Sequence, residues 1–211
     1  GTHLRTSPTN WNRVLGGDGM DNDVDPNTNN TLYASIYYGE FFKSTNGGNN
    51  FSSINTNLSP AGSGNWVTPF KCDPNTSNTI YAGFKKIWKS TNAGISWSAT
   101  SSNNISGNSN IDEFEIAPSN SNYIYALINR RIFLSTNGGS TWIDRSNNGN
   151  LSPQYNILGV DIDDTDPLHL VISCSGYNNS NKVFESTNGG QQWTNISSGL
   201  PSVPANCAQF E

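Results

Sequence analysis

The hydrophobic positions of this chain come in short runs that alternate with polar positions at a period of two. Tyr33, Ser35 and Tyr37 fall on one side of such a run, as do alternate residues of the run 124–128. Alternation at this period is typical of β-strands, because successive side chains point to opposite faces of a sheet. Stretches rich in Asn, Asp, Pro and Gly separate the runs. The pattern therefore predicts many short strands joined by turns, with little helix.

One eight-residue string recurs four times, roughly every 45–50 residues. It reads STNGGNNF from Ser44, STNAGISW from Ser90, STNGGSTW from Ser135 and STNGGQQW from Ser186. An aromatic residue lies two positions before each serine, and another lies seven positions after it. Asn-Gly between two apolar strands is a strong hairpin signal, because both residues tolerate a positive φ. The string therefore predicts a tight turn between two strands, covered by an aromatic ring.

Each copy belongs to a longer unit. A turn rich in Asn, Asp or Pro and then a short apolar run precede it, as in DPNTNNTLYAS from Asp25 and DPNTSNTIYAG from Asp73. The corresponding stretches later in the chain are APSNSNYIYAL from Ala117 and DPLHLVIS from Asp166. Each unit thus supplies four short strands. Four-stranded units at this period are typical of a β-propeller, in which every sheet needs its neighbours to bury both faces.

We therefore predict an all-β protein with a β-propeller fold, made of four complete four-stranded blades plus partial blades at both ends. We expect it to be a fragment of a larger propeller. Within one propeller region, 1–211, the expected segments are the end of a preceding blade at 1–15, blades at 16–57, 58–103, 104–148 and 149–199, and the start of a following blade at 200–211.

Composition narrows the choice of partners. The net charge is −5, whereas a nucleic-acid-binding surface needs a basic footprint, so nucleic acid is not an expected partner. No apolar run reaches the length of about 18 residues that a membrane-spanning helix needs, so no membrane span is expected.

The cysteines and histidines do not form a recognisable metal motif. Cys72, Cys174 and Cys207 lack paired C-x-x-C spacing, and His3 and His169 are the only histidines, which argues against zinc. We expect three buried thiols, and a disulfide between Cys174 and Cys207 stays open. His169 lies in the apolar run LHLVIS and is expected to be packed within a strand.

The repeated string resembles the Asp-box, or bacterial neuraminidase repeat, of pattern S-x-D-x-G-x-x-W, with Asn in place of the usual Asp. Together with DPNTxNTxYA it looks like the Asp-box propellers of sortilin and xyloglucanase type, common in large secreted bacterial proteins. The resemblance implies the propeller fold and an extracellular or cell-surface location, but no particular activity, because the repeat occurs in enzymes, receptors and assembly factors. The matching positions are Ser44, Asn46, Gly48, Phe51, Ser90, Asn92, Gly94, Trp97, Ser135, Asn137, Gly139, Trp142, Ser186, Asn188, Gly190 and Trp193.

The resemblance also places these turns on the face opposite the usual binding face, so we interpret their aromatic residues as packing groups. Candidate ligand residues lie instead on the hairpins between second and third strands and on the links between blades. Aromatic and basic side chains there would suit a glycan or an acidic partner, although the basic ones could equally be solvated hairpin tips. The candidates are Tyr37, Tyr38, Trp66, Lys85, Lys86, Arg130, Arg131, Tyr155 and Tyr177.

Catalytic residues are not assigned. A glycosidase needs two carboxylates flanking a cleft, and the candidates are Asp18, Asp21, Asp23, Asp112, Glu113, Glu115, Asp161, Asp163 and Asp164. The segments that carry catalysis in xyloglucanase-type enzymes and sialidases are missing here, and no Ser-His-Asp arrangement is credible. The acidic runs DNDVD and DIDDTD have the composition of calcium loops but not the EF-hand spacing. No metal and no cofactor are predicted.

The sequence thus favours a non-catalytic recognition or scaffold module of a secreted or cell-surface bacterial protein, binding a polysaccharide or another surface protein. The alternative is a fragment of a glycoside hydrolase of xyloglucanase or sialidase type, with catalytic residues partly outside this segment. Such a hydrolase would show an open cleft with two carboxylates. A purely structural spacer would show no pocket. The oligomeric state stays open.

Overall fold

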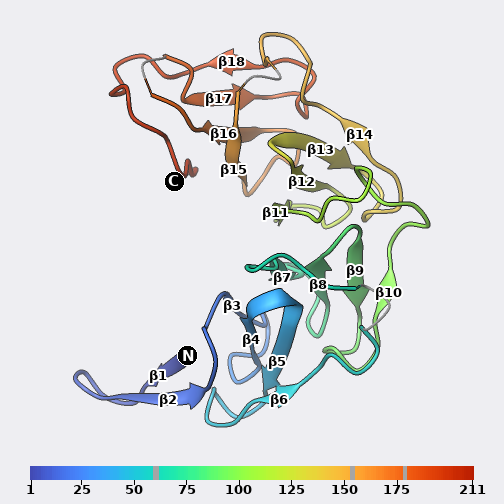
Figure 1. The fold of residues 1–211 in the computed structure, drawn as a ribbon, viewed down its shortest axis with the longest axis vertical. Helices are drawn as coiled ribbons and strands as arrows, with labels where there is room; N and C mark the ends of the chain where they lie inside the picture. The colour runs from blue at the N-terminus through green and yellow to red at the C-terminus, as the bar shows by residue number, and fades with distance from the viewer. Residues whose placement is uncertain (59–61, 153–154, 178–179) are drawn as a thin grey trace. The chain divides into compact units, whose positions relative to one another are not determined.

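The computed structural model describes residues 1–58, 62–152, 155–177 and 180–211. These residues form antiparallel sheets and almost no helix (Figure 1). The chain divides into two compact units, Gly1–Asn104 and Ile105–Glu211.

Unit 1 contains a two-stranded sheet and two four-stranded sheets, in which strands that follow one another in sequence also pair. A 3-10 turn, Tyr37–Gly39, joins β4 to β5. The strands are β1 (Thr2–Arg5), β2 (Trp11–Leu15), β3 (Asn22–Val24), β4 (Leu32–Ile36), β5 (Glu40–Ser44), β6 (Ser52–Ser53), β7 (Phe70–Cys72), β8 (Ile80–Gly83), β9 (Ile87–Ser90) and β10 (Ser98–Ala99).

Unit 2 contains two further four-stranded sheets with the same sequential pairing. Its strands are β11 (Glu113–Ile116), β12 (Ile124–Ile128), β13 (Arg131–Ser135), β14 (Ile143–Asp144), β15 (Ile157–Ile162), β16 (Leu170–Cys174), β17 (Val183–Ser186) and β18 (Thr194–Asn195). The prediction of four-stranded antiparallel units is confirmed in both units.

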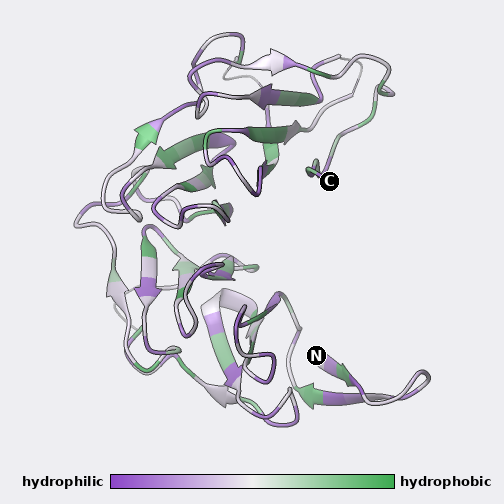
Figure 2. Ribbon diagram, turned by 180° about the vertical axis from the view of Figure 1, so that it is seen from behind, coloured by the Kyte–Doolittle hydropathy of each residue, from purple (hydrophilic) through white to green (hydrophobic). Residues whose placement is uncertain are grey.

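The inner strands are apolar on both faces because sheets stack on one another within each unit. Every residue of β8, β12 and β16 is buried, whereas β6, β10, β14 and β18 are only two residues long and largely exposed. Figure 2 shows the hydrophobic colour on inner strands such as β13 and β16. Each unit therefore has its own core between its sheets.

The repeated turn has one geometry in all four sheets. In the turn after β13, the Ser135 hydroxyl donates to Asn137 Oδ1 at 3.0 Å and accepts the Gly139 N–H at 2.8 Å. Asn137 Oδ1 also accepts the Thr141 N–H at 2.9 Å. The same three bonds occur after β5, β9 and β17. A buried serine and an asparagine thus satisfy the turn's backbone, as local side-chain chemistry predicts.

The asparagine uses one oxygen for both acceptor roles, which explains why Asn can stand at this position. Two consecutive residues after each asparagine have positive φ: 67° at Gly138 and 89° at Gly139 in the third copy. The second copy places Ala93 at the first of these positions with φ 56°. Glycine is favoured here because it adopts positive φ without steric cost.

Hydrogen bonds also tie neighbouring sheets of unit 1 together. The Asp23 carboxylate on β3 accepts the Cys72 N–H of β7 at 2.7 Å, and the Asp25 carboxylate accepts the Asn78 N–H at 2.7 Å. The Trp97 indole N–H donates to the Ile54 carbonyl at 2.9 Å. These aspartates therefore act as structural links between sheets.

Two expectations about single residues are wrong. His169 precedes β16 instead of lying within it, and its imidazole contacts two carboxylates. Cys72 and Cys174 are buried free thiols, but Cys207 is exposed. Burial raises the pKa of the Cys174 thiol to about 12, so this thiol stays protonated and inert at neutral pH.

Candidate ligand-binding site

Three of the predicted ligand residues come together in unit 1. Tyr37 and Tyr38 lie on the hairpin between β4 and β5, and Trp66 comes from the link between β6 and β7. The Tyr37 and Trp66 rings stack with centroids 5.4 Å apart and an interplanar angle of 22°. The Tyr38 ring meets Trp66 edge-on, at 5.3 Å and 89°. We call these three residues the aromatic platform.

The platform is open to solvent. Tyr38 is 51% exposed and Trp66 is 50% exposed, although large aromatic side chains normally bury most of their surface. Tyr37 covers one face of Trp66 and Tyr38 abuts it edge-on, which fixes the orientation of the indole. The rings touch one another, so they leave no room between them for the cation of an aromatic cage.

The hairpin places Tyr38 through an uncommon backbone conformation. Tyr38 has φ 62° and ψ 21°, in the left-handed region, which is costly for a bulky residue and is found mostly where function requires it. Gly39 follows with φ +84°, and a Cβ there would lie 2.8 Å from the Phe84 ring. Only glycine fits at this position, so Phe84 packs directly beneath the hairpin.

An asparagine from the same sheet holds the hairpin. The Asn55 amide donates to the Gly39 carbonyl at 2.7 Å, and its Oδ1 accepts the Phe41 N–H at 2.7 Å. Both ends of the side-chain amide are therefore used on the backbone around Tyr38. This bidentate contact rigidifies the hairpin and limits the entropy that a ligand would have to remove.

Backbone hydrogen bonds join the link to the hairpin in both directions. The Tyr38 N–H donates to the Trp66 carbonyl at 3.3 Å, and the Gly64 N–H donates to the Tyr38 carbonyl at 3.2 Å. A Cβ on Gly64 would lie 2.1 Å from the Thr68 hydroxyl, so the link folds closely on itself. Two segments well separated in sequence are thereby fixed as one surface.

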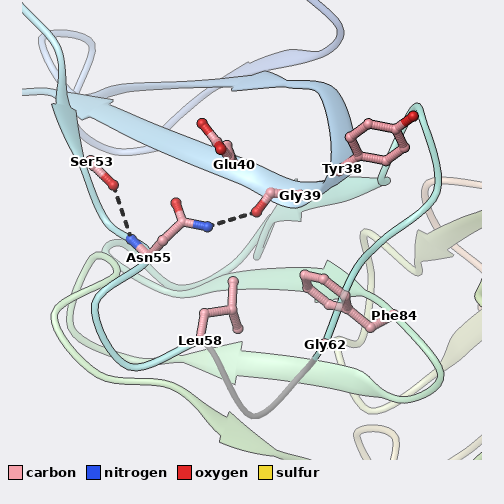
Figure 3. A pocket seen from close by; sticks show the side chains of 8 residues that line it. All are labelled: Tyr38, Gly39, Glu40, Ser53, Asn55, Leu58, Gly62 and Phe84. Atoms are coloured by element: carbon pink, nitrogen blue, oxygen red, sulfur yellow. Dashed lines mark hydrogen bonds between the residues drawn. The ribbon is translucent and has the colours of Figure 1, made fainter.

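A cavity of about 390 Å³ lies beside the platform. Figure 3 shows Tyr38, Gly39 and Glu40 on one side of it, and Leu58 and Phe84 on the other. Ser53, Asn55 and Gly62 complete the lining. A cavity of this size matches the range of small-molecule sites, and Tyr38 belongs to both the cavity and the platform.

The four predicted basic residues divide between the two units. Lys85 and Lys86 lie between β8 and β9 of unit 1, where the Lys86 ammonium donates to the Ser102 carbonyl. In unit 2, Arg130 is exposed, with φ 66°, and Arg131 pairs with Asp144. The Lys86 side chain is thus held by the segment that follows β10, and the Arg131 side chain is held by Asp144 on β14.

The two remaining predicted aromatics differ in exposure. Tyr155 stacks on Phe184, with ring centroids 5.3 Å apart, and packs against the core of unit 2. Tyr177 follows β16 and is 71% exposed. Residues 178–179 of the same hairpin lie outside the described residues.

Most candidate carboxylates accept backbone hydrogen bonds. Asp112 accepts the Asn129 N–H at 2.8 Å, Asp161 accepts the Phe210 N–H at 2.8 Å, and Asp23 accepts the Cys72 N–H. Asp21 differs: burial raises its pKa, although Lys71 and the Asn22 N–H act in the opposite direction.

Among the described residues, no group of three His, Cys, Asp or Glu side chains could hold a metal ion. Nor do these residues include a helix long and apolar enough to cross a bilayer.

Sequence reasoning missed the residues that support the platform. Asn55 and Phe84 stand in different parts of the chain from Tyr38, and neither carries a local motif. The pair Tyr38-Gly39 was the available signal, because a glycine after an exposed aromatic at a hairpin tip indicates a strained turn.

No protein-family model and no curated protein matches the chain. Solved structures do. An ancestral GH74 enzyme is 24% identical, with a TM-score of 0.62, covering 88% of this chain and 25% of that one. YCF48 from Cyanidioschyzon merolae is 15% identical, with a TM-score of 0.59, covering 93% of this chain and 65% of that one. The extracellular domain of the one-component system BT4673 from B. thetaiotaomicron is 10% identical, with a TM-score of 0.58 and coverages of 93% and 25%.

These similarities show the fold alone: the chain has the all-β β-propeller fold. It spans a quarter of the length of the GH74 enzyme and of the BT4673 domain, and 65% of YCF48.

Proposed function

We propose that the chain is a non-catalytic recognition module of a secreted or cell-surface bacterial protein, and that its aromatic platform binds a polysaccharide. The observation that carries the proposal is the platform itself: Trp66 and Tyr38 are half exposed, yet both are fixed by ring contacts and backbone bonds. A group of adjoining, rigid, solvent-facing aromatic rings, unlike a single exposed one, is typical of a surface that contacts a ligand.

A sugar ring suits this surface chemically. One face of a pyranose carries C–H groups and packs on an indole or phenol ring, while its hydroxyls remain available for hydrogen bonds. Glu40 and Ser53 line the adjacent cavity, which could accept a neighbouring sugar unit of the same chain. Because Asn55 and the backbone bonds fix the platform in advance, binding would order few side chains.

The proposal includes the identity and division of the repeats. We assign the four repeated turns to the Asp-box, with Asn in place of Asp, and the shared serine, asparagine and glycine contacts support this assignment. We assign the blades as 16–57, 58–103, 104–148 and 149–199, with partial blades at 1–15 and 200–211. Of the other predicted ligand residues, Tyr177 and Arg130 have the exposure that a second contact area would need.

Affinity electrophoresis tests the platform directly. The chain would be run through gels containing soluble xyloglucan, hydroxyethylcellulose or polygalacturonate. We expect retardation by at least one polysaccharide, and a loss of affinity of about tenfold or more in Trp66→Ala, which corresponds to about 1.4 kcal/mol. Trp11→Ala is the matched control, since Trp11 is 61% exposed on β2 and outside the platform.

Two results would overturn this proposal. One is a wild-type chain that none of the three polysaccharides, nor a wider glycan array, retains. The other is a Trp66→Ala variant that binds as tightly as wild type. Retention by a protein partner alone, with Trp66→Ala abolishing it, would instead assign the same platform to protein recognition.

A second candidate, a fragment of a glycoside hydrolase, is favoured by one observation. Asp21 lies in a cavity of about 220 Å³ that His3 also lines, and burial raises the Asp21 pKa, as a general acid requires. Release of reducing ends from xyloglucan by the wild type, lost in Asp21→Asn, would support this candidate. Equal release by both proteins would refute the role of Asp21.

A further inference from the structure

His169 lies between two carboxylates in unit 2. It ends the turn between β15 and β16, where its carbonyl accepts the Asp163 N–H at 3.0 Å. Its Nδ1 lies 3.2 Å from Asp163 Oδ2, and its Nε2 lies 2.8 Å from Glu185 Oε1 on β17. The imidazole therefore bridges the turn and a strand through both ring nitrogens.

This geometry requires the charged form of the ring. An ionised carboxylate can only accept hydrogen bonds, so each ring nitrogen must carry a proton to bond both partners. The hydrogen bond to Glu185 is the main reason that the pKa of His169 is raised above its ordinary value; partial burial of the ring acts in the opposite direction, and the hydrogen bond to Asp163 adds to the rise. Asp163 stays ionised, because the hydroxyl and amide of Thr165 lower its pKa to about 2.

The last residues of the sequence lie against this group. We call residues 205–211 the C-terminal segment; Figure 1 shows it ending beside β15 and β16. The Phe210 ring meets the His169 ring at 4.6 Å and 63°. The Phe210 N–H donates to Asp161 Oδ2 at 2.8 Å, and the Ala205 N–H donates to the Cys174 carbonyl at 3.2 Å. The segment is thus attached at both ends.

The attachment repeats a link of unit 1. There, Asp23 accepts the N–H of Cys72, which lies 49 residues further along the chain. Asp161 accepts the N–H of Phe210, also 49 residues further along. Cys72 belongs to the first strand of the next sheet, so Phe210 holds the corresponding place beside the last sheet of unit 2. In unit 2 an imidazole adds to this link.

The surroundings of the imidazole are acidic. Asp161 on β15, Asp163 in the turn and Glu185 on β17 face it or its aromatic neighbour. Asp164 and Asp166 belong to the same turn, and Glu211 follows Phe210. The imidazolium places a positive charge among these carboxylates.

We propose that His169 is a pH-sensitive clasp that holds the C-terminal segment on unit 2. The protonated ring bonds Asp163 and Glu185 and attracts the π-system of Phe210. The neutral ring has one N–H donor and one unprotonated nitrogen. The lone pair of that nitrogen faces the oxygen of one carboxylate, which repels it, and without its positive charge the ring no longer attracts the π-system of Phe210. The carboxylates then carry uncompensated negative charge, and the segment loosens around Phe210, where only the hydrogen bond to Asp161 remains of the described contacts, while the Ala205 end stays bonded to the Cys174 carbonyl.

The direction of the pH effect follows from the sign of the shift. The pKa of His169 is raised above the ordinary value of 6.5, so the stabilisation is complete below that value. It is lost as the pH rises through the raised pKa. The clasp is therefore closed in acid and opens in alkali.

Hydrogen exchange of the Phe210 amide, followed by NMR, measures the clasp. Protection is corrected for the intrinsic exchange rate at each pH, and we expect it to fall about tenfold between about pH 5.5 and about pH 8.5. In His169→Gln the protection should be low and independent of pH. His3→Gln removes the other histidine, on β1, and should keep the wild-type profile.

A reciprocal measurement keeps the test sound if His169→Gln folds poorly. Because docking and protonation are linked, Phe210→Ala should lower the pKa of the His169 imidazole, read from its ring resonances. The proposal is overturned if wild-type Phe210 protection is independent of pH. It is equally overturned if the His169 ring titrates identically in wild type and Phe210→Ala.

Discussion

The two ends of each four-stranded sheet behave differently. At one end, the turn after the third strand has the same serine, asparagine and glycine contacts in every sheet, with corresponding distances that agree within 0.1 Å, as for the four Ser–Asn bonds of 2.9, 2.9, 3.0 and 3.0 Å. At the other end, the hairpin between the second and third strands differs in each sheet. It carries a strained tyrosine between β4 and β5, and a two-residue Asn129-Arg130 turn between β12 and β13.

The contrast shows which turns are specified by their own residues and which depend on distant segments. The repeated turn satisfies its own backbone with short side chains, so sequence alone specifies it and substitutions there should cost stability. The variable hairpins depend on contacts from distant segments, such as Asn55 and Trp66 around Tyr38. Changes at their exposed side chains should alter binding and leave folding almost intact.

The largest expected effect separates two tryptophans of unit 1. Trp97 is 7% exposed, packs near Phe41 and donates to the Ile54 carbonyl. Trp97→Ala should lower the free energy of unfolding by about 3–5 kcal/mol, because it leaves a cavity and an unpaired carbonyl. Trp66→Ala should change it by less than about 0.5 kcal/mol. Urea unfolding followed by circular dichroism measures both.

Equal losses of stability in these two variants would contradict the comparison, since they would make Trp66 a core residue. Trp97→Phe refines the result: it keeps an aromatic ring but removes the indole N–H. Its cost should be smaller than that of Trp97→Ala and should contain the hydrogen bond to Ile54.

The next effect tests the repeated turn. Ser135 is 1% exposed, and its hydroxyl bonds both Asn137 Oδ1 and the Gly139 N–H. Ser135→Ala leaves a buried N–H unsatisfied and should cost about 1–3 kcal/mol. Thr136→Ala is the matched neighbour, because Thr136 is exposed. A Ser135→Ala variant as stable as Thr136→Ala would show that the turn does not depend on this network.

The sequence made the repeated turn predictable because its chemistry is local. Ser44, Asn46 and Gly48 contact one another within a stretch of five residues, so the local sequence is enough to predict these hydrogen bonds. The platform was only partly predictable: the exposed Tyr37, Tyr38 and Trp66 could be selected, but their stacking depends on a link whose path no local pattern shows. The prediction for His169 was wrong because its apolar neighbours in the sequence are typical of a strand. The two carboxylates that its ring contacts, Asp163 and Glu185, lie six and sixteen residues away in the sequence, so the local pattern does not show them.

A smaller effect of opposite sign is expected at a variable hairpin. Arg130 has φ 66° and Asn129 has φ 51°, so both central residues of this two-residue turn are in the conformation that favours Asn-Gly. Arg130→Gly relieves the steric cost but increases the freedom of the unfolded chain. The net result should be a stabilisation of about 0.5 kcal/mol, measured by the urea midpoint. Destabilisation would show that the arginine side chain supports the hairpin.

The smallest effect is expected where the turn departs from the residue usual in the repeat. Asn137 Oδ1 accepts from Ser135 and from the Thr141 N–H, while its Nδ2 donates to the Thr141 hydroxyl at 2.8 Å. In Asn137→Asp one carboxylate oxygen keeps both acceptor roles. The Thr141 hydroxyl can rotate to donate a hydrogen bond to the second carboxylate oxygen. The unfolding free energy should therefore change by less than about 0.5 kcal/mol. Asn137→Leu has similar volume without an acceptor and should cost about 1 kcal/mol or more. If aspartate cost as much as leucine, the amide donor would be the essential group, and this turn would differ in mechanism from a carboxylate-based one.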